Sequence, residues 1–340
     1  MKRQALWFEA PYRMGIREEE LSGPSETEVT VRTIVSAVSA GTEILIYRGE
    51  APADLAVDAT IGSLQGTFSF PMKYGYAAVG EVISLGPGVD PLWQGRKVFS
   101  FQPHQSHFLA KVTELLPLPS DVEILDAVFL PNMETAVNLL LDGKPSVGEQ
   151  VAVFGQGIVG LLVTAILARI PLACLLTLDR FAARRRVSEH LGAHKSIDPA
   201  GRTKEEILSL LQGPREYKGA DLSYEVSGNP EALDQAIAVT GFGGRIVVGS
   251  WYGTKDAILR LGGPFHRSRI RILSSQVSSI DTRLGERWTK KRLLGVTWRF
   301  LADVKPSQLI THTFPFSEVK QAYSLLNKNP GDCLQVVLAY

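Results

Sequence analysis

Residues 151–179 read VAVFGQGIVGLLVTAILARIPLACLLTLD, and this stretch decides the fold of the chain. An apolar run predicts a buried strand, a helix-length apolar segment follows, and a second apolar run ends in Asp179. Between the first strand and the helix lie three glycines, Gly155, Gly157 and Gly160. Glycines at this spacing permit a tight turn, a close approach of the backbone to a pyrophosphate, and close packing of helix against strand. Free N–H groups at the start of the helix favour an anion. The stretch therefore predicts a dinucleotide site.

The composition of the whole chain favours a small-molecule partner. A length of 340 residues predicts two domains, and a formal net charge of +1 gives no strong field for nucleic acid or an anionic membrane. The two cysteines, Cys174 and Cys333, cannot form a disulfide framework or a cysteine metal site. The start, MKRQALWFEAPYR, lacks the continuous apolar region of a secretory signal, so we expect a cytoplasmic protein.

Two kinds of pattern divide the chain. Up to about residue 120 the apolar runs are short and broken by Gly, Pro and Ser, which is typical of an irregular β-rich domain. Strand and helix patterns then alternate, which predicts a parallel α/β sheet. The expected strands are 150–155, 174–179, 194–197, 220–226, 244–250 and 269–277, after a helical pattern over 122–141. The expected helices between them are 158–168, 182–191, 204–211 and 230–240, the last capped by Asn229.

The tail of the chain is irregular again, like its start. We therefore expect 1–121 and 284–340 to form one domain and 122–283 to form a doubly wound cofactor domain, with the site in the cleft between the two.

Motifs along the whole chain resemble the medium-chain dehydrogenase/reductase superfamily, the alcohol-dehydrogenase-like proteins. VSAGTEILIYRG resembles that family's GICGTDxHIYRG, and KYGYAAVGEVISLGPGV resembles its LGHExxGEVVEVGxGV. The glycine fingerprint and the ending DCLQVVLAY also fit. The resemblance implies a GroES-like catalytic domain and a Rossmann cofactor domain. VSAVSAGTE and LPNMETAVNLL are most similar to the branch that contains the hydroxyethyl-bacteriochlorophyllide dehydrogenase.

Departures from the family pattern indicate that no zinc is bound. Where zinc-using relatives carry their ligands, this chain has Ala40, Tyr76 and Pro131, with Ala77 beside the second, and it lacks the four-cysteine structural lobe. A zinc site needs three protein ligands with S, N or O donors. The histidines are interpreted as ordinary surface or cleft residues, among them the pairs His104 with His107 and His190 with His194.

The resemblance implies that residues at the former ligand positions face the nicotinamide. Thr42 matches the family's proton-relay Ser or Thr, so Thr42 and Tyr76 are expected to hold and protonate a carbonyl oxygen; alternatively, Tyr76 fills the vacated metal position. Glu43 replaces an acid that orients its neighbours. Glu134 precedes Thr135, whose counterpart touches the nicotinamide; it is a substrate ligand, an acid/base group or a structural carboxylate.

Asp179 stands where an acid accepts hydrogen bonds from the adenosine ribose hydroxyls, so NAD(H) is the preferred cofactor. Arg180 and Arg184 follow and could accommodate a 2′-phosphate, which keeps NADP(H) possible. The remaining expected cofactor contacts follow the predicted strands or start the first helix: Ile158, Val159, Val226, Ser227, Gly228, Gly249, Ser250 and Ser275.

These features predict a zinc-independent NAD(P)(H)-dependent oxidoreductase that interconverts a secondary alcohol and a ketone. Two other functions stay open: a quinone or enone reductase of the same superfamily, and a non-catalytic NAD(P)H-binding sensor or structural protein. The substrate does not follow from the fold. By analogy with the family we expect a homodimer formed by extending the sheet at 269–277.

Overall fold

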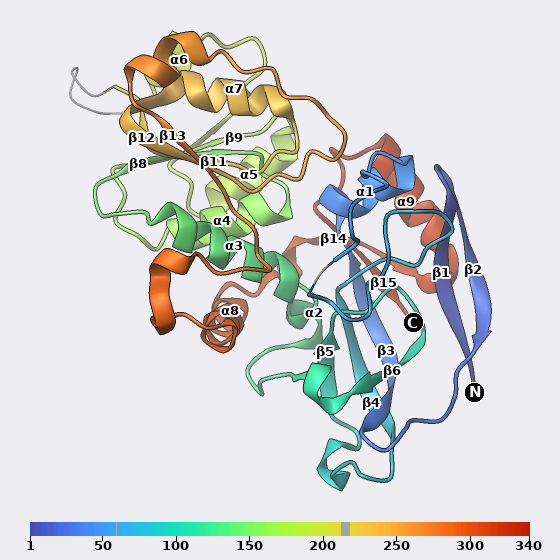
Figure 1. Cartoon of the computed structure of the whole chain (residues 1–340). Coiled ribbons are helices and arrows are strands. Elements are labelled where there is room, and N and C mark those ends of the chain that lie inside the picture. Colours follow the sequence, from blue (N-terminus) through green and yellow to red (C-terminus); the bar gives the residue numbers. More distant parts are fainter. Residues whose placement is uncertain (59, 212–217) are drawn as a thin grey trace. The chain divides into compact units, whose positions relative to one another are not determined.

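The computed structural model describes residues 1–58, 60–211 and 218–340, which divide into two compact units (Figure 1). Unit 1 contains Met1–Pro131 and Leu301–Tyr340, and unit 2 contains Asn132–Phe300. The division falls inside helices α3 (Leu130–Gly143) and α8 (Lys290–Val304), whereas the sequence placed the boundaries after 121 and before 284.

Unit 2 contains the predicted doubly wound sheet. Its six strands are β8 (Gln150–Phe154), β9 (Cys174–Leu178), β10 (Lys195–Ile197), β11 (Ala220–Glu225), β12 (Thr240–Val248) and β13 (Arg271–Ser274). They pair in parallel in the order β10-β9-β8-β11-β12-β13. The order reverses between β8 and β11, which makes the crevice at their carboxyl ends the expected place for a ligand. The α/β fold class predicted from the sequence is confirmed.

Helices cover both faces of this sheet, as its strands require. The central strands β8 and β9 are buried on both sides, and a parallel sheet of this kind is stable only when both faces are covered. Figure 1 shows α6 (Lys204–Leu208) and α7 (Pro230–Val239) over one face. The other face carries α3, α4 (Ile158–Leu167) and α5 (Ala182–His190). Asn229 caps α7 as expected, accepting a hydrogen bond from the Glu231 N–H.

Several predicted elements have different bounds in the structure. The helical pattern over 122–141 forms two helices, α2 (Ile124–Ala127) and α3. Pro131 explains the break, since proline has no N–H to continue an earlier helix but is tolerated in a first turn. β12 begins earlier than expected, where Thr240 pairs with Ala220. β13 is shorter than expected and begins after Arg269, which has a positive φ of 53°.

Unit 1 is built on an irregular sheet of seven strands beside a hairpin. The hairpin joins β1 (Lys2–Ala10) and β2 (Arg13–Glu20). The sheet has the order β14-β15-β3-β4-β5-β7, and β6 also pairs with β3. Its strands are β3 (Glu28–Val38), β4 (Ala78–Leu85), β5 (Lys97–Ser100), β6 (His107–Lys111), β7 (Leu116–Pro117), β14 (Ile310–Pro315) and β15 (Gln335–Ala339).

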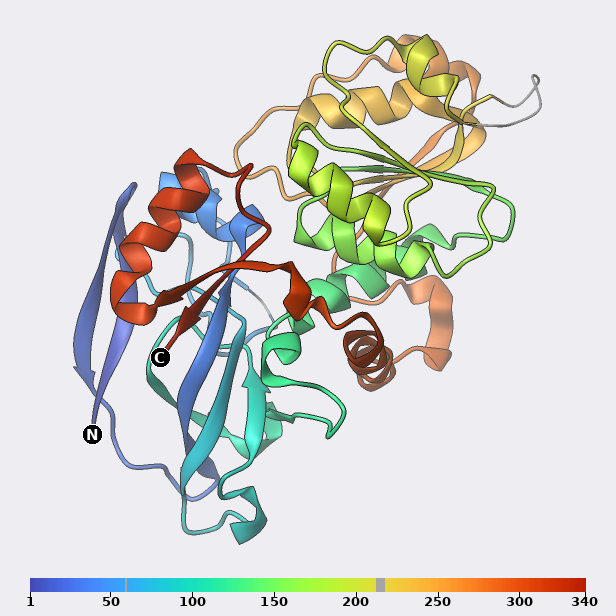
Figure 2. The same cartoon turned by 180° about the vertical axis from the view of Figure 1, so that it is seen from behind.

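The end of the chain completes the sheet that its start begins. β15 pairs with β3 in antiparallel register, with Val336 opposite Val38, and Figure 2 shows this red strand beside the blue one. Helices α1 (Ala40–Arg48) and α9 (Val319–Lys328) belong to the same unit and contact one another. Among the helices of the described residues, none has the length and apolar content that crossing a membrane requires.

Candidate active site

Two glycines in the turn of unit 2, Gly155 and Gly160, leave no room for a side chain. Gly155 has a φ of +94°, and a Cβ there would lie 2.5 Å from the Ser227 Cα. A Cβ on Gly160 would lie 1.9 Å from the Gly155 carbonyl oxygen, so that glycine lets α4 approach the turn. Gly157 is the N-cap of α4 and offers no capping side chain, which leaves the N–H groups of the first turn for an anion. Ile158 and Val159 begin the helix.

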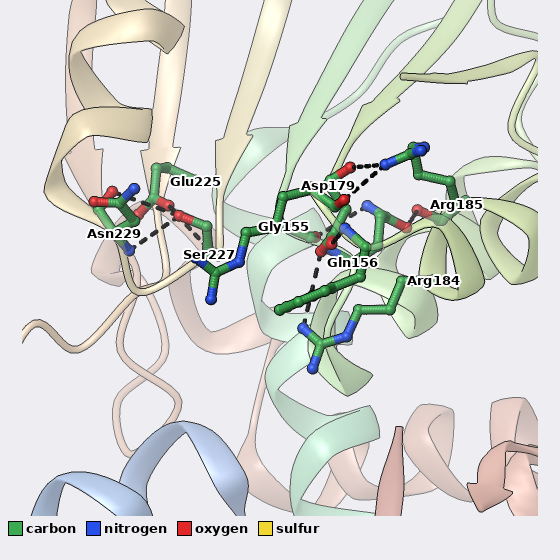
Figure 3. Close-up of polar contacts among 11 residues, drawn as sticks. Gly155, Gln156, Asp179, Arg184, Arg185, Glu225, Ser227 and Asn229 are labelled. Atoms are coloured by element: carbon green, nitrogen blue, oxygen red, sulfur yellow. Dashed lines mark hydrogen bonds and ion pairs between the residues drawn. The ribbon is translucent and has the colours of Figure 1, made fainter. Parts of the chain in front are cut away.

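Asp179 is fixed against this turn. Its side chain is 7% exposed; Oδ2 accepts from the Gln156 N–H at 2.8 Å, and Oδ1 accepts from the Phe181 N–H at 2.8 Å (Figure 3). Each carboxylate oxygen can accept more than one hydrogen bond. Asp179 is therefore a rigid acceptor with capacity for ribose hydroxyls.

Two arginines gather around the same acid. The guanidinium groups of Arg180 and Arg184 lie 4.6 Å and 4.8 Å from the ring centroid of Phe181, and Arg184 Nη1 is 3.9 Å from Asp179 Oδ2. Arg185 turns instead to the carbonyl oxygens of residues 179 and 180 and to Asp198. Positive charge thus lies beside Asp179.

A buried carboxylate organises the loops on the other side of Gly155 (Figure 3). Glu225, at the end of β11, is fully buried and accepts hydrogen bonds from the Ser227 N–H at 2.8 Å and from the Tyr252 hydroxyl. The Gly228 N–H donates to Ser250 Oγ at 2.8 Å, which joins the loops after β11 and β12. Glu225 and Tyr252 were not predicted from the sequence, although a carboxylate at the end of a buried strand was a visible signal.

The structure brings the expected cofactor residues of unit 2 to one edge of its sheet. They follow the carboxyl ends of parallel strands: Asp179, Val226, Ser227, Gly228, Gly249, Ser250 and Ser275. Ser275 Oγ also accepts from Asn138 Nδ2 of α3 at 3.2 Å.

The expected catalytic hydroxyls of unit 1 meet at the start of α1. Half-buried Tyr76 donates its hydroxyl to Ser39 Oγ and also hydrogen-bonds to Thr42. Burial raises the pKa of Tyr76 above its ordinary value of 10.0, and the hydrogen bonds with Ser39 and Thr42 oppose this only in part. Tyr76 is therefore a neutral phenol that can give a proton rather than take one. Ser39 was not predicted.

A buried carboxylate and histidine lie behind these hydroxyls. Glu43 and His104 are both 0% exposed, and His104 Nε2 lies 2.9 Å from Glu43 Oε2. The Tyr323 hydroxyl donates to the same oxygen, and the Ser39 N–H donates to Oε1 at 2.7 Å. The other ring nitrogen of His104 is 2.7 Å from Ser36 Oγ. The interpretation of His104 as an ordinary surface or cleft residue is wrong, because this polar network holds it in the core.

The residues at the family's zinc positions do not fit a zinc ion. Ala40 and Pro131 have no donor atom, and the hydroxyl of Tyr76 is hydrogen-bonded to Ser39. In the part of the chain that the structure describes, no three His, Cys, Asp or Glu side chains gather to hold a metal.

Glu134 lies on α3 in unit 2 and has a cationic partner. Its Oε1 is 2.7 Å from Lys290 Nζ, and that amine also donates to the Val277 carbonyl oxygen at 3.2 Å. Burial raises the pKa of Glu134, while Lys290 lowers it. Of the roles left open by the sequence, the structural carboxylate agrees best with this pairing. Thr135 is the next residue of the same helix.

Known dehydrogenases resemble this chain in sequence. The family described as zinc-binding dehydrogenase matches residues 159–290, which lie in unit 2. L-threonine 3-dehydrogenase of Caldanaerobacter subterraneus is 32% identical over 211 residues, which cover 60% of this chain and 54% of the relative. The chain is thus similar to zinc-binding dehydrogenases over this part, and it spans about half the length of this relative.

Two further likenesses extend over the whole length. The 2-desacetyl-2-hydroxyethyl bacteriochlorophyllide A dehydrogenase of Cereibacter sphaeroides is 25% identical, covering 99% of this chain and 98% of the relative. The structure of the Escherichia coli CFT073 alcohol dehydrogenase RspB, complexed with NADH, has a TM-score of 0.80 at 20% identity, covering 100% of this chain and 99% of that one. The likeness in structure confirms the GroES-like plus Rossmann fold.

Proposed function

We propose that this chain is an NAD(P)(H)-dependent oxidoreductase that interconverts a secondary alcohol and a ketone without a catalytic zinc ion. One observation carries the proposal. Where zinc-dependent relatives place a ligand, this chain has Tyr76, whose hydroxyl meets those of Ser39 and Thr42. A neutral donor at that position can take over the metal's task at the substrate oxygen.

The donors must stabilise the charge that develops on a carbonyl oxygen. A zinc ion contributes several kcal/mol by polarising a carbonyl. One preorganised donor contributes about 3 kcal/mol at a developing oxyanion, so Tyr76 and Thr42 together supply a comparable amount. The raised pKa keeps Tyr76 protonated, so its hydroxyl is present to hydrogen-bond to a ketone oxygen, whereas a role as the base in alcohol oxidation would need a lowered pKa.

Unit 2 has the residues to hold the dinucleotide. The glycine turn and the start of α4 would bind the pyrophosphate, and Asp179 would accept from the ribose hydroxyls. When bound, the nicotinamide supplies or accepts the hydride. The fixed carboxylate of Asp179 repels a 2′-phosphate, which favours NAD(H). Arg180 and Arg184 supply opposing positive charge, so NADP(H) binds more weakly rather than not at all.

Glu134 has a structural role in this proposal, pairing α3 with Lys290 of α8, and does not transfer a proton. Its carboxylate is 3% exposed and paired with Lys290, so it offers neither a free acid nor a free base. Removal of its charge is expected to change the stability of the protein more than the chemical step.

Tyr76→Phe and Thr42→Val test the proposal. Each variant should bind NADH with wild-type affinity and reduce ketones on the order of 100-fold more slowly, since each loses one oxyanion donor. Tyr12→Phe removes the hydroxyl of an exposed tyrosine, 57% exposed, and is the matched control. If both variants keep wild-type turnover, their side chains are not the donors. Turnover of enones or quinones alone would instead support a C=C reductase, and tight NADH binding without turnover would support a sensor.

A further inference from the structure

The serine that begins α1 does not use its side chain as a helix cap. Serine at an N-cap ordinarily accepts a hydrogen bond from the second or third N–H of the helix. Ser39 is the N-cap of α1, yet its side chain makes no such bond. The Thr42 and Glu43 N–H groups donate to the Ser39 carbonyl oxygen at 3.1 Å and 2.8 Å instead. The hydroxyl of Ser39 therefore remains available for Tyr76.

Glu43 holds Ser39 in this conformation. Its Oε1 accepts from the Ser39 backbone N–H at 2.7 Å, and its Oε2 lies against His104 Nε2 and the Tyr323 hydroxyl. These partners come from α1, from the segment before β6, and from α9. The carboxylate is thus anchored on three sides, and it fixes the residue that carries the hydroxyl.

We propose that Ser39 is the second hydroxyl of a proton relay that restores the proton of Tyr76 after each turnover. The inference rests on the proposed function, because it concerns the proton that reaches the substrate oxygen. A hydroxyl can donate and accept at once, so a chain of two hydroxyls can pass a proton without any charged residue. Glu43 is a positioning residue in this relay and does not carry the proton.

The step balances for ketone reduction. The hydride, with its electron pair, bonds to the carbonyl carbon, and the π electron pair moves to the oxygen. That oxygen takes the Tyr76 proton, whose bonding pair stays on the phenol oxygen. The Ser39 hydroxyl then gives its proton to Tyr76 and takes one from water. Ser39 is only half-buried, and the next residue, Ala40, is exposed, so water can reach it.

Ser39→Ala and Ser39→Thr distinguish a relay from a structural role. Since the side chain makes no cap bond, Ser39→Ala should melt and bind NADH like the wild type. Its kcat for ketone reduction should fall by about 10- to 100-fold with KM little changed, and its solvent deuterium isotope effect should rise. Ser39→Thr restores a hydroxyl and should recover most of the rate. Ser84→Ala, at an exposed serine on β4, is the control.

A second measurement does not depend on turnover. With tyrosine labelled by ¹³C at Cζ, Tyr76→Phe identifies the Tyr76 signal among nine tyrosines. That signal should shift in Ser39→Ala and stay in place in Ser84→Ala. An unshifted Tyr76 signal in Ser39→Ala would overturn the relay. So would a wild-type kcat and isotope effect in Ser39→Ala, measured where Tyr76→Phe has lost turnover. Either result would leave the proposed function standing. A wild-type protein that reduces no ketone would overturn both.

Discussion

Replacement of Glu43 by glutamine tests how strongly the buried network holds unit 1 together. The carboxylate accepts three hydrogen bonds, from the Ser39 N–H, from His104 Nε2 and from the Tyr323 hydroxyl. An amide of the same shape has one oxygen and one NH₂ group. If its oxygen faces His104 and Tyr323, its NH₂ group faces the Ser39 N–H, and two donors oppose one another.

The expected loss in the free energy of unfolding can be estimated from these contacts. Hydrogen bonds to a charged group contribute about 1.5–3 kcal/mol, and a buried donor left unsatisfied costs about 1–3 kcal/mol. We therefore expect Glu43→Gln to lower the free energy of unfolding by about 3 kcal/mol. For a unit of this size, 1 kcal/mol corresponds to about 2–4 °C, so the melting temperature of unit 1 should fall by about 6–12 °C.

Differential scanning calorimetry measures this shift, with Glu81→Gln as the matched control. Glu81 forms ion pairs with Arg32 and Lys97 on the surface of the same unit. Surface pairs contribute about 0–1 kcal/mol, so the control should melt close to the wild type. Equal melting temperatures for Glu43→Gln and Glu81→Gln would refute the reasoning, because the network would then contribute no more than a surface pair.

Three further predictions concern the cofactor, the donor and the buried acid. Asp179→Ala should weaken NADH binding by about tenfold, since it removes a charged acceptor, and should narrow the preference for NADH over NADPH; fluorescence titration measures both, and an unchanged ratio would contradict the assignment. Because burial raises the pKa of Tyr76 above 10.0, the phenol stays protonated and kcat for ketone reduction should show no tyrosine titration up to pH 9; a fall centred below that pH would be inconsistent with a neutral donor. Because burial raises the pKa of Glu134 in the folded protein, its contribution is fully present below its unfolded pKa and is lost as the pH rises through the folded one. Urea unfolding of wild type and Glu134→Gln at pH 4, 5.5 and 7 measures this. As the pH rises from 4 to 7, the free energy of unfolding of the wild type should fall relative to that of the variant; a relative rise would contradict this.

The sequence predicts the fold of unit 2 well because its central strands, such as β8 and β9, are short apolar runs with turn residues on either side. Runs such as 150–154 and 174–178 are buried on both faces, and their order follows from the alternation with helices. The predicted bounds of a strand were wrong where a tertiary contact decides where the strand begins. β12 starts early because Thr240 finds a partner in β11, which no local pattern reveals.

The site was predictable only in part, for the same reason. Thr42, Glu43 and Tyr76 stand in motifs that resemble a known family, and whether they act as proposed stays a prediction. His104 and Tyr323 join the network from parts of the chain far from Glu43, so no spacing could reveal their contacts. The sequence PHQSHF around His104 is polar and predicts a surface residue. In the structure the His104 ring lies between Glu43 and Ser36.

Metal-free turnover is the measurement that tests the proposed chemistry most directly. Protein stripped of metal, with chelator present throughout, would be assayed for loss of NADH and NADPH absorbance against ketones, enones and quinones. We predict ketone reduction at the same rate with and without chelator, faster with NADH, and strongly reduced in Tyr76→Phe. Activity that appears only when zinc is added back would contradict the assignment of Tyr76 as the donor that takes the metal's place.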